Sequence, residues 1–132
     1  MAWIHLVAIL ALVQYLWFGA LVARARGKYG VQAPATTGNE VFERYYRVQM
    51  NTLELMVVLL PAMWVAASYW NARWAAAAGM VYLIGRMVYL RAYTRDPASR
   101  GLGFVLSMAP VTVLIVAALA GMALQALGIV AP

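Results

Sequence analysis

The 132-residue chain is 66% hydrophobic and only 11% charged, with a net charge of +6. Soluble domains carry roughly 25% charged residues, so this composition excludes an ordinary soluble domain and indicates a membrane protein. The absence of cysteine excludes disulfides, thiolate metal sites and a cysteine nucleophile. With a single histidine, His5, a histidine metal site is not expected either. Neither a metal nor a nucleic acid is predicted as a partner.

The first predicted element is an uncharged helix over residues 3–23. Nothing basic precedes it and no clean cleavage site ends it, so we expect a retained membrane helix rather than a signal peptide. A polar loop with several glycines and a proline follows. The string from Thr37 to Glu40 has the form of a capping box, which predicts a second helix over 39–70. Pro61 is expected to kink that helix.

A tight turn at 71–73 leads to a third predicted helix over 74–93. Asp96 and Pro97 break the chain, and a fourth helix is expected over 102–127, interrupted by Pro110. Each helix approaches the roughly 20 residues that span a bilayer. The predicted fold is an all-α membrane protein, a bundle of four transmembrane helices forming one domain over the whole chain.

The basic residues are distributed unevenly between the predicted loops. The short second loop holds only Arg73, whereas the first and third loop regions hold Arg24, Arg26, Lys28, Arg44, Arg47, Arg91, Arg95 and Arg100. The positive-inside rule then predicts an integral, multi-pass protein with loops one and three in the cytoplasm and both termini on the opposite side. A basic cytoplasmic face also suits anionic lipid or an anionic ligand.

A row of polar residues begins the second predicted helix. Arg47, Asn51 and Glu54 are spaced i, i+4, i+7, which places them within about 60° of one another on the helix. An ionised carboxylate exposed to lipid costs roughly 2.5 to 3.5 kcal/mol or more. Glu54 must therefore face a partner or a wet cavity.

The third predicted helix carries a matching stripe. Tyr82, Arg86, Tyr89 and Tyr93 follow one another at spacings of 4, 3 and 4. In a purely structural interpretation, Glu54 pairs with Arg86 and the tyrosines form an interfacial belt. In a functional one, both stripes face a pocket for a zwitterionic or anionic ligand, because arginine forks clamp carboxylates and a carboxylate accepts an ammonium. The residues alone do not decide between the structural and the functional interpretation, and they identify no reaction.

Two blocks within residues 42–93 resemble a known family. They read FERYYRVQMNTLELMVVLLPAMWVAA and GMVYLIGRMVYLRAY, and the first contains the motif E-R-x-x-R-x-Q-x-N-x-x-E. Both are similar to the membrane-associated proteins in eicosanoid and glutathione metabolism, the MAPEG family, in its microsomal glutathione transferase and leukotriene C4 synthase branch. The resemblance extends over about 100 residues and is weaker in the first and last helices.

The resemblance implies a homotrimer with glutathione, as co-substrate, bound between subunits near the cytoplasmic face. The implied glutathione-binding residues of one subunit are Arg47, Asn51, Glu54, Arg86, Tyr89 and Tyr93. Gln49 and Arg26 match residues that the neighbouring subunit offers. Arg100 matches the arginine that stabilises the thiolate, the implied catalytic residue.

Two departures from the family pattern concern the binding site. Leu55 stands where leukotriene synthases have a tyrosine. The paired arginines that end the family's first helix are spread here over Arg24, Arg26 and Lys28, so their individual roles are not fixed by the alignment.

The predicted function is membrane-bound glutathione transfer to hydrophobic electrophiles that enter from the bilayer, with peroxidase activity on lipid hydroperoxides as a second activity. One alternative is a non-catalytic lipid-binding member of the family, and another is a small four-helix exporter of cationic drugs. A lone membrane carboxylate suits an exporter, but arginines around Glu54 would repel cationic cargo. The electrophile itself is not predicted.

Overall fold

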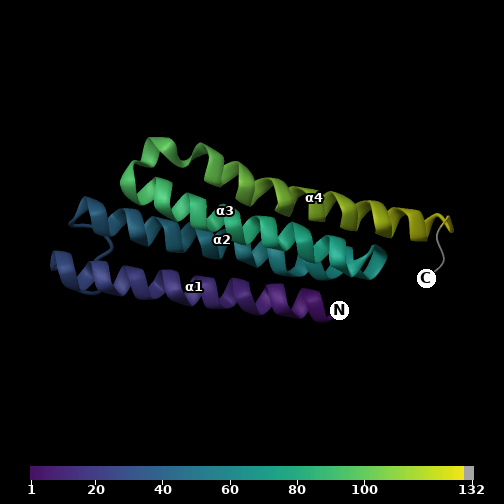
Figure 1. Cartoon of the computed structure of the whole chain (residues 1–132), viewed down its shortest axis with the longest axis horizontal. Coiled ribbons are helices and arrows are strands. Elements are labelled where there is room, and N and C mark those ends of the chain that lie inside the picture. Colours follow the sequence, from purple (N-terminus) through teal and green to yellow (C-terminus); the bar gives the residue numbers. More distant parts are fainter. Residues whose placement is uncertain (130–132) are drawn as a thin grey trace.

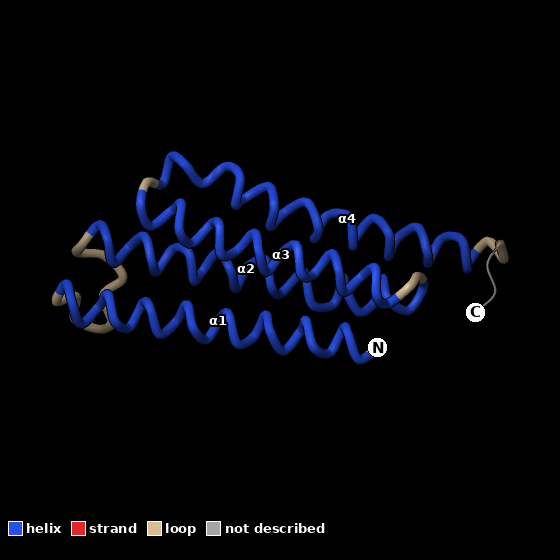
Figure 2. The backbone as a smooth tube through the Cα atoms, in the orientation of Figure 1, coloured by secondary structure: helices blue, strands red, loops and turns tan. Residues whose placement is uncertain are grey.

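Four long helices make up the structure, a computed structural model that describes residues 1–129 (Figure 1). They are α1 (Ala2–Tyr29), α2 (Glu40–Tyr69), α3 (Ala72–Arg95) and α4 (Gly101–Ala126). A short 3₁₀ helix, η1 (Pro97–Arg100), joins α3 to α4. Figure 2 shows helices and connecting loops, with no strand in the described part of the chain. The prediction of an all-α chain with four helices is confirmed.

The two middle helices, α2 and α3, each pack against the other three elements of the bundle, and α1 and α4 lie on opposite sides of them (Figure 1). Successive helices run antiparallel. The start of α1 and the end of α4 lie at one end, and the α1–α2 loop and η1 lie at the other, which we call the loop end. The loop end carries the candidate site.

The first helix is longer than predicted. It continues beyond residue 23 to Tyr29, so Arg24, Arg26 and Lys28 are helical rather than part of a loop. Gly27 does not break the helix; the end comes at Gly30, whose φ of 68° lies in the left-handed region that favours glycine. Basic side chains in a last turn interact favourably with the helix dipole, which suits Arg26 and Lys28 in the last turn of α1.

The second helix begins with a different cap from the predicted one. The Asn39 side chain accepts hydrogen bonds from the backbone N–H groups of Val41 and Phe42, at 3.0 and 3.1 Å. Glu43 Oε1 accepts from the Gly38 N–H at 2.9 Å. The capping box starting at Thr37 was therefore wrong, because asparagine is a better N-cap than threonine and Asn39 stands one residue before the helix.

The last two helices also differ from the predicted ranges. An Asn71 side-chain cap starts α3 at Ala72, and α3 continues to Arg95. The helix α4 runs without interruption through Pro110, so the predicted break there was wrong. Likewise α2 is continuous through Pro61. Membrane helices tolerate proline because neighbouring helices and hydroxyl side chains can satisfy the backbone carbonyls that proline leaves without a partner.

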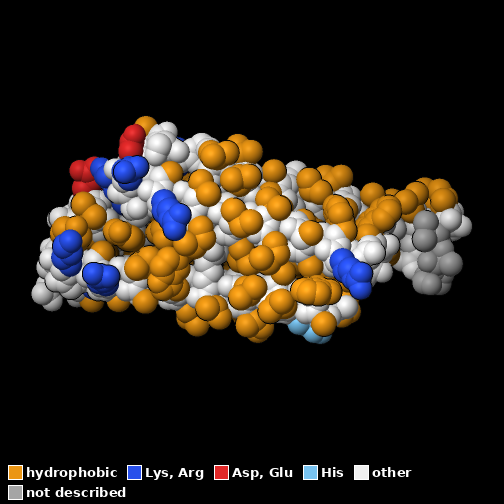
Figure 3. All heavy atoms as spheres, in the orientation of Figure 1, with side chains coloured by type: hydrophobic (Ala, Val, Ile, Leu, Met, Phe, Trp, Pro, Cys, Tyr) orange, Lys and Arg blue, Asp and Glu red, His pale blue; other side chains and the backbone are white. Residues whose placement is uncertain are grey.

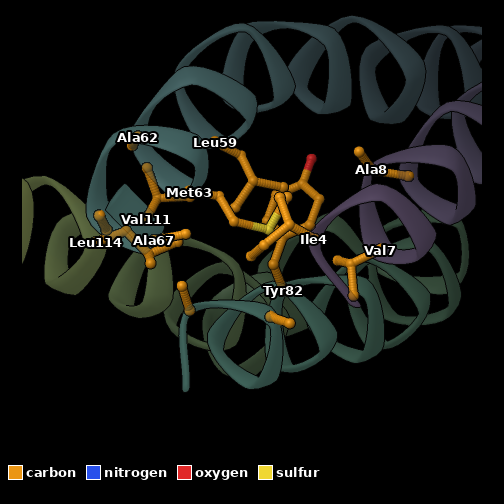
Figure 4. Close-up of a cluster of buried hydrophobic side chains, with 14 of the residues drawn as sticks. Ile4, Val7, Ala8, Leu59, Ala62, Met63, Ala67, Tyr82, Val111 and Leu114 are labelled. Atoms are coloured by element: carbon orange, nitrogen blue, oxygen red, sulfur yellow. The ribbon is translucent and has the colours of Figure 1, made fainter. Parts of the chain in front are cut away.

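The core between the helices combines small and large apolar side chains (Figure 4). Ile4 of α1, Leu59 and Met63 of α2, and Leu114 of α4 are fully buried in one cluster. Ala75 of α3 is also fully buried, and such small residues let membrane helices approach closely. The core thereby fixes the relative positions of α2 and α3, which carry the two polar stripes.

Among the described residues, three segments are long and apolar enough to cross a membrane: Ala2–Tyr29, Glu40–Tyr69 and Pro97–Ala126. The helix α3 falls outside this set despite its 24 residues, because it carries four arginines. Figure 3 shows apolar side chains covering the middle of the bundle, with charged side chains gathered mainly at the loop end. The prediction of four apolar spans is therefore met by three of the helices; on α3, Arg86 is buried between its neighbours, whereas the other three arginines are exposed near the helix ends.

Candidate functional site

Arg47, Asn51 and Glu54 form one continuous row on α2, as their spacing predicts. Arg47 Nη1 lies 3.5 Å from Glu54 Oε1, and Asn51 Nδ2 donates to Glu54 Oε2 at 3.3 Å. The Arg47 and Glu54 side chains are 54% and 57% exposed. The row is therefore a charged surface in the loop-end half of α2, before the apolar run that completes the helix, and it is open to a ligand or a neighbouring protein.

Directly behind this row lies Arg86, which is fully buried. Its Nε and Nη2 donate to Thr52 Oγ1 at 3.1 and 2.8 Å, and Nη1 donates to Asn51 Oδ1 at 3.0 Å. Longer bonds of 3.4 Å run from Nη1 to Ser107 Oγ and from Nη2 to the Val48 carbonyl. All three guanidinium nitrogens are thus occupied within the subunit, linking α3 to α2 and α4.

The predicted structural alternative, an ion pair between Glu54 and Arg86, was wrong. Glu54 pairs with Arg47 on its own helix, and the Arg86 guanidinium reaches Asn51 instead. Two of its partners, Thr52 and Ser107, were missed by the sequence analysis. The sequence feature that could have identified them is a hydroxyl residue within an apolar helical segment. A hydroxyl buried there must find a hydrogen-bond partner.

The tyrosines of α3 continue the inner stripe toward the loop end. Tyr82 is buried and its hydroxyl donates to the Thr52 carbonyl at 3.3 Å. The Arg86 guanidinium carbon lies 4.3 Å from the centroid of the Tyr89 ring, and Tyr89 stacks on Tyr93 with centroids 5.3 Å apart. Tyr89 is almost fully buried, so Tyr93 is the more accessible of the stacked pair.

One cavity at the loop end is lined by one member of each stripe. Its volume is about 460 Å³, and Arg47 of α2 and Tyr93 of α3 both line it. The other lining residues come from the α1–α2 loop, the start of α2 and η1: Thr36, Thr37, Glu40, Glu43, Arg44, Tyr46 and Pro97. Arg44 pairs with Glu40 and donates to the Arg95 carbonyl, which ties the cavity wall to the end of α3.

Arg100 stands at the junction of η1 and α4, exposed at the loop end. The short helix η1, which ends with Arg100, packs against α3. The close approach of α4 to α3 depends on Gly103: a β-carbon there would lie 2.5 Å from the Tyr89 Cα. Glycine at this position therefore lets η1 and Arg100 sit beside the stacked tyrosines.

Gln49 and Arg26 lie apart from the row. The Gln49 amide packs against Gly19 of α1, where its Nε2 would be 2.8 Å from an added β-carbon. Arg26 donates to the Ala35 carbonyl at 2.7 Å and lies 4.6 Å above the Phe42 ring. Within one subunit these two residues belong to the α1–α2 side of the bundle.

Leu55 occupies a different environment from the polar row. It is buried among the apolar residues of the main core. The position that departs from the resembled pattern therefore contributes to packing in this chain.

Sequence comparison relates the chain to known proteins. Residues 4–120 match the sequence profile of the MAPEG family. The chain is 45% identical over 117 residues to an uncharacterized protein of Synechocystis, covering 89% of this chain and 85% of that protein. It is 38% identical over 102 residues to human microsomal glutathione S-transferase 2, covering 77% of this chain and 69% of the relative.

Guinea pig leukotriene C4 synthase is 38% identical over 94 residues, covering 71% of this chain and 63% of that enzyme. The matched region in the family profile includes most of each of the four helices and every residue of the polar row. A match over nearly the whole chain establishes kinship, and the chain is a member of the MAPEG family of membrane proteins.

Proposed function

We propose that this protein is a membrane-bound glutathione transferase that conjugates glutathione to hydrophobic electrophiles, with peroxidase activity on lipid hydroperoxides as a second activity. Relatives that include microsomal glutathione S-transferase 2 support a glutathione-related transferase function. The observation that carries the proposal is the exposed row of Arg47, Asn51 and Glu54, held in place by the buried Arg86.

The charges of the row match those of glutathione. Glutathione has two carboxylates and one ammonium group, so it needs cationic clamps and one anionic partner. Arg47 would bind a carboxylate, for which an arginine fork is well suited. Glu54 would accept the ammonium, and Asn51 Nδ2, which already donates toward Glu54, would donate to the peptide.

Arg86 has a different role in this proposal from the one the resemblance implies. Because its guanidinium makes five hydrogen bonds inside the subunit, it has no free donor to offer to glutathione. Instead it holds the Asn51 oxygen inward, which turns the Asn51 amide nitrogen toward Glu54 and the ligand. Arg86 is therefore a positioning residue, and Arg47 is the carboxylate clamp.

Activation of the thiol is assigned to Arg100. A free thiol has a pKa of about 8.5 and is mostly protonated at neutral pH, whereas its thiolate is the nucleophile. A guanidinium beside the sulfur favours the thiolate. Tyr93, accessible and next to the cavity that Arg47 lines, would add a hydroxyl donor, with Tyr89 stacked behind it. Catalysis then combines proximity with electrostatic stabilisation.

The site is proposed to lie between subunits of a homotrimer. An ion pair that is half exposed on a membrane helix needs a cover other than lipid, because charged groups are costly in hydrocarbon. A neighbour's Gln49 and Arg26, which lie on another side of the subunit, would complete the site. The loop end is proposed to face the cytoplasm, in line with its excess of basic residues.

The pairing of Glu54 argues against a cation exporter. Such a transporter needs a carboxylate free to exchange a proton for cargo. Here the cationic Arg47 lies 3.5 Å from Glu54 and would repel cationic cargo. The arginine beside Glu54 makes the surroundings more suitable for an anionic or zwitterionic ligand than for a cation.

Turnover of purified protein in liposomes tests the proposal. Glutathione is supplied with a panel of membrane-soluble electrophiles, including an aryl halide, an epoxide and an unsaturated aldehyde, and conjugates are quantified. Conjugates from wild type that fall in Arg47→Ala but persist in Arg73→Ala, at the opposite end of the bundle, are the expected result. Glutathione binding without turnover on any electrophile supports the lipid-binding alternative, and drug-dependent proton flux unaffected by glutathione supports the exporter.

A further inference from the structure

A second cavity, separate from the proposed glutathione site, lies at the loop end between α1 and α2. Its volume is about 230 Å³, several times the roughly 30 Å³ that one water occupies in the liquid. Its lining combines two cations, two tyrosines and small apolar residues: Arg24, Lys28, Tyr29, Tyr45, Leu21 and Ala25. None of these side chains has a part in the proposed transferase chemistry.

Among residues 1–129, the two cations of this cavity have no carboxylate partner. There are four acidic residues in the sequence, and the structure engages each of them elsewhere: Glu40 with Arg44, Glu54 with Arg47, Glu43 with the Gly38 N–H, and Asp96 with the Ala98 N–H. An anion that neutralises Arg24 and Lys28 must therefore come from outside the described chain.

Arg26, between these two cations in sequence, serves a different purpose. Its guanidinium donates to the Val31 and Ala35 carbonyls and so shapes the α1–α2 loop. Residues 24 and 28 lie one turn apart on one face of α1, about 200° from residue 26. The last two turns of α1 thus carry Arg26 on one side and a pair of exposed cations over the cavity on the other.

The face that carries the two cations becomes apolar toward the middle of the bundle. Trp17, Leu21, Arg24 and Lys28 follow at spacings of 4, 3 and 4, so they share one stripe of α1. Trp17 is 43% exposed, and its neighbour Leu16 is 70% exposed. A ligand that fits this stripe has an anionic head for the cations and an apolar tail for the surface beside Trp17.

We infer that this cavity binds the phosphate of an anionic membrane phospholipid. Arg24 and Lys28 would contact the phosphate oxygens, with arginine able to bind two of them at once. Tyr29 and Tyr45 add hydroxyl donors at the cavity wall. The acyl chains would lie along the exposed apolar surface of α1. The same chemistry would also accept a soluble phosphate ion, so the test separates these two sources.

The test is native mass spectrometry of the purified, delipidated protein with phosphatidylglycerol, phosphatidylcholine or sodium phosphate added. The variant is Arg24→Gln/Lys28→Gln. The matched control is Arg91→Gln/Arg95→Gln, which removes two exposed positive charges at the same end of the bundle but outside the cavity. Lys28→Arg serves as a conservative variant, because it keeps the cation.

Wild type, control and Lys28→Arg are expected to retain phosphatidylglycerol in preference to phosphatidylcholine. The double cavity variant is expected to bind phosphatidylglycerol with about 30-fold lower apparent affinity. This is the usual effect of removing from a protein two cations that attract anionic lipid. Equal losses in the cavity variant and the control, or no loss in either, would overturn the site. If sodium phosphate displaces phosphatidylglycerol from wild type, the lipid assignment is overturned and a soluble phosphate is the ligand.

Discussion

Arg86 Nη1 of α3 donates to Asn51 Oδ1 of α2 across 3.0 Å, and the other end of the same amide donates to Glu54. A buried cation thus sets the orientation of an amide that reaches the surface. The chain Arg86, Asn51, Glu54 and Arg47 connects the interior of the bundle to its exposed charged row. This continuity gives separate roles to two arginines that the sequence pattern treats alike.

Replacing Arg86 by lysine is expected to weaken both stability and glutathione binding. Lysine keeps the charge but lacks the fork that bonds Thr52, Asn51 and Ser107 together. Each buried group left unsatisfied costs about 1 to 3 kcal/mol, so thermal unfolding should shift clearly downward. In steady-state kinetics, KM for glutathione should rise more than kcat falls. A variant that retains wild-type KM and unfolding temperature would contradict the positioning role.

Arg47→Ala is expected to lower glutathione affinity about 10- to 100-fold, the range for losing a hydrogen bond to a charged group of about 1.5 to 3 kcal/mol. Calorimetric titration with glutathione measures the change. Glu54→Gln should lose affinity for glutathione but less for an analogue whose amino group is acetylated, since that analogue has no ammonium for the Glu54 carboxylate to bind. If both variants bind both ligands as wild type does, the row is not the binding surface.

Gly103→Ala is expected to separate α4 from α3. The added β-carbon would lie 2.5 Å from the Tyr89 Cα and backbone nitrogen, and both are main-chain atoms that have no freedom to rotate away. Overpacking of this kind costs about 1 to 3 kcal/mol, and it should displace Arg100 from the tyrosines.

The matched control is Gly101→Ala, two residues earlier, where nothing lies within 4 Å of an added β-carbon. Its unfolding temperature and turnover should stay at the wild-type level or rise slightly, because alanine favours the helix over glycine. If Gly103→Ala and Gly101→Ala have the same unfolding temperature and the same turnover, close packing of α4 on α3 at Gly103 is contradicted.

Subunit sharing predicts complementation between inactive variants. Arg47→Ala removes a residue of one side of the proposed site and Gln49→Ala removes one from the other side. In mixed oligomers made by co-expression, some interfaces would carry neither change and should recover turnover above that of either variant alone. The measurement is conjugate formation by doubly tagged, purified oligomers. Activity no higher than the average of the two variants would contradict a shared site.

The polar row and the tyrosine stripe could be predicted from sequence because helical periodicity fixes which side chains share a face. The spacing of Arg47, Asn51 and Glu54 led directly to the contacts seen between them. Periodicity does not fix which residue on a second helix each one meets. That information depends on how closely α3 and α4 approach, which Gly103 controls, and so Ser107 was not predicted as a partner of Arg86.

Helix ends were the weakest part of the prediction for a physical reason. Several polar residues near each end compete as caps, and Asn39 rather than Thr37 captured the free N–H groups of α2. Arg24, Arg26 and Lys28 were assigned to a loop by their charge, yet the last turn of α1 stabilises cations through its dipole.

The most direct test of the central claim is a glutathione titration of the purified protein, followed by the ultraviolet absorbance of bound thiolate. Wild type is compared with Arg100→Ala and with Arg95→Ala, a nearby exposed arginine that has no assigned role. If Arg100 stabilises the thiolate, wild type and Arg95→Ala will both show a thiolate signal. In Arg100→Ala this signal will be smaller, although glutathione still binds. Wild type that binds glutathione without forming thiolate, or an Arg100→Ala signal equal to wild type, would contradict it.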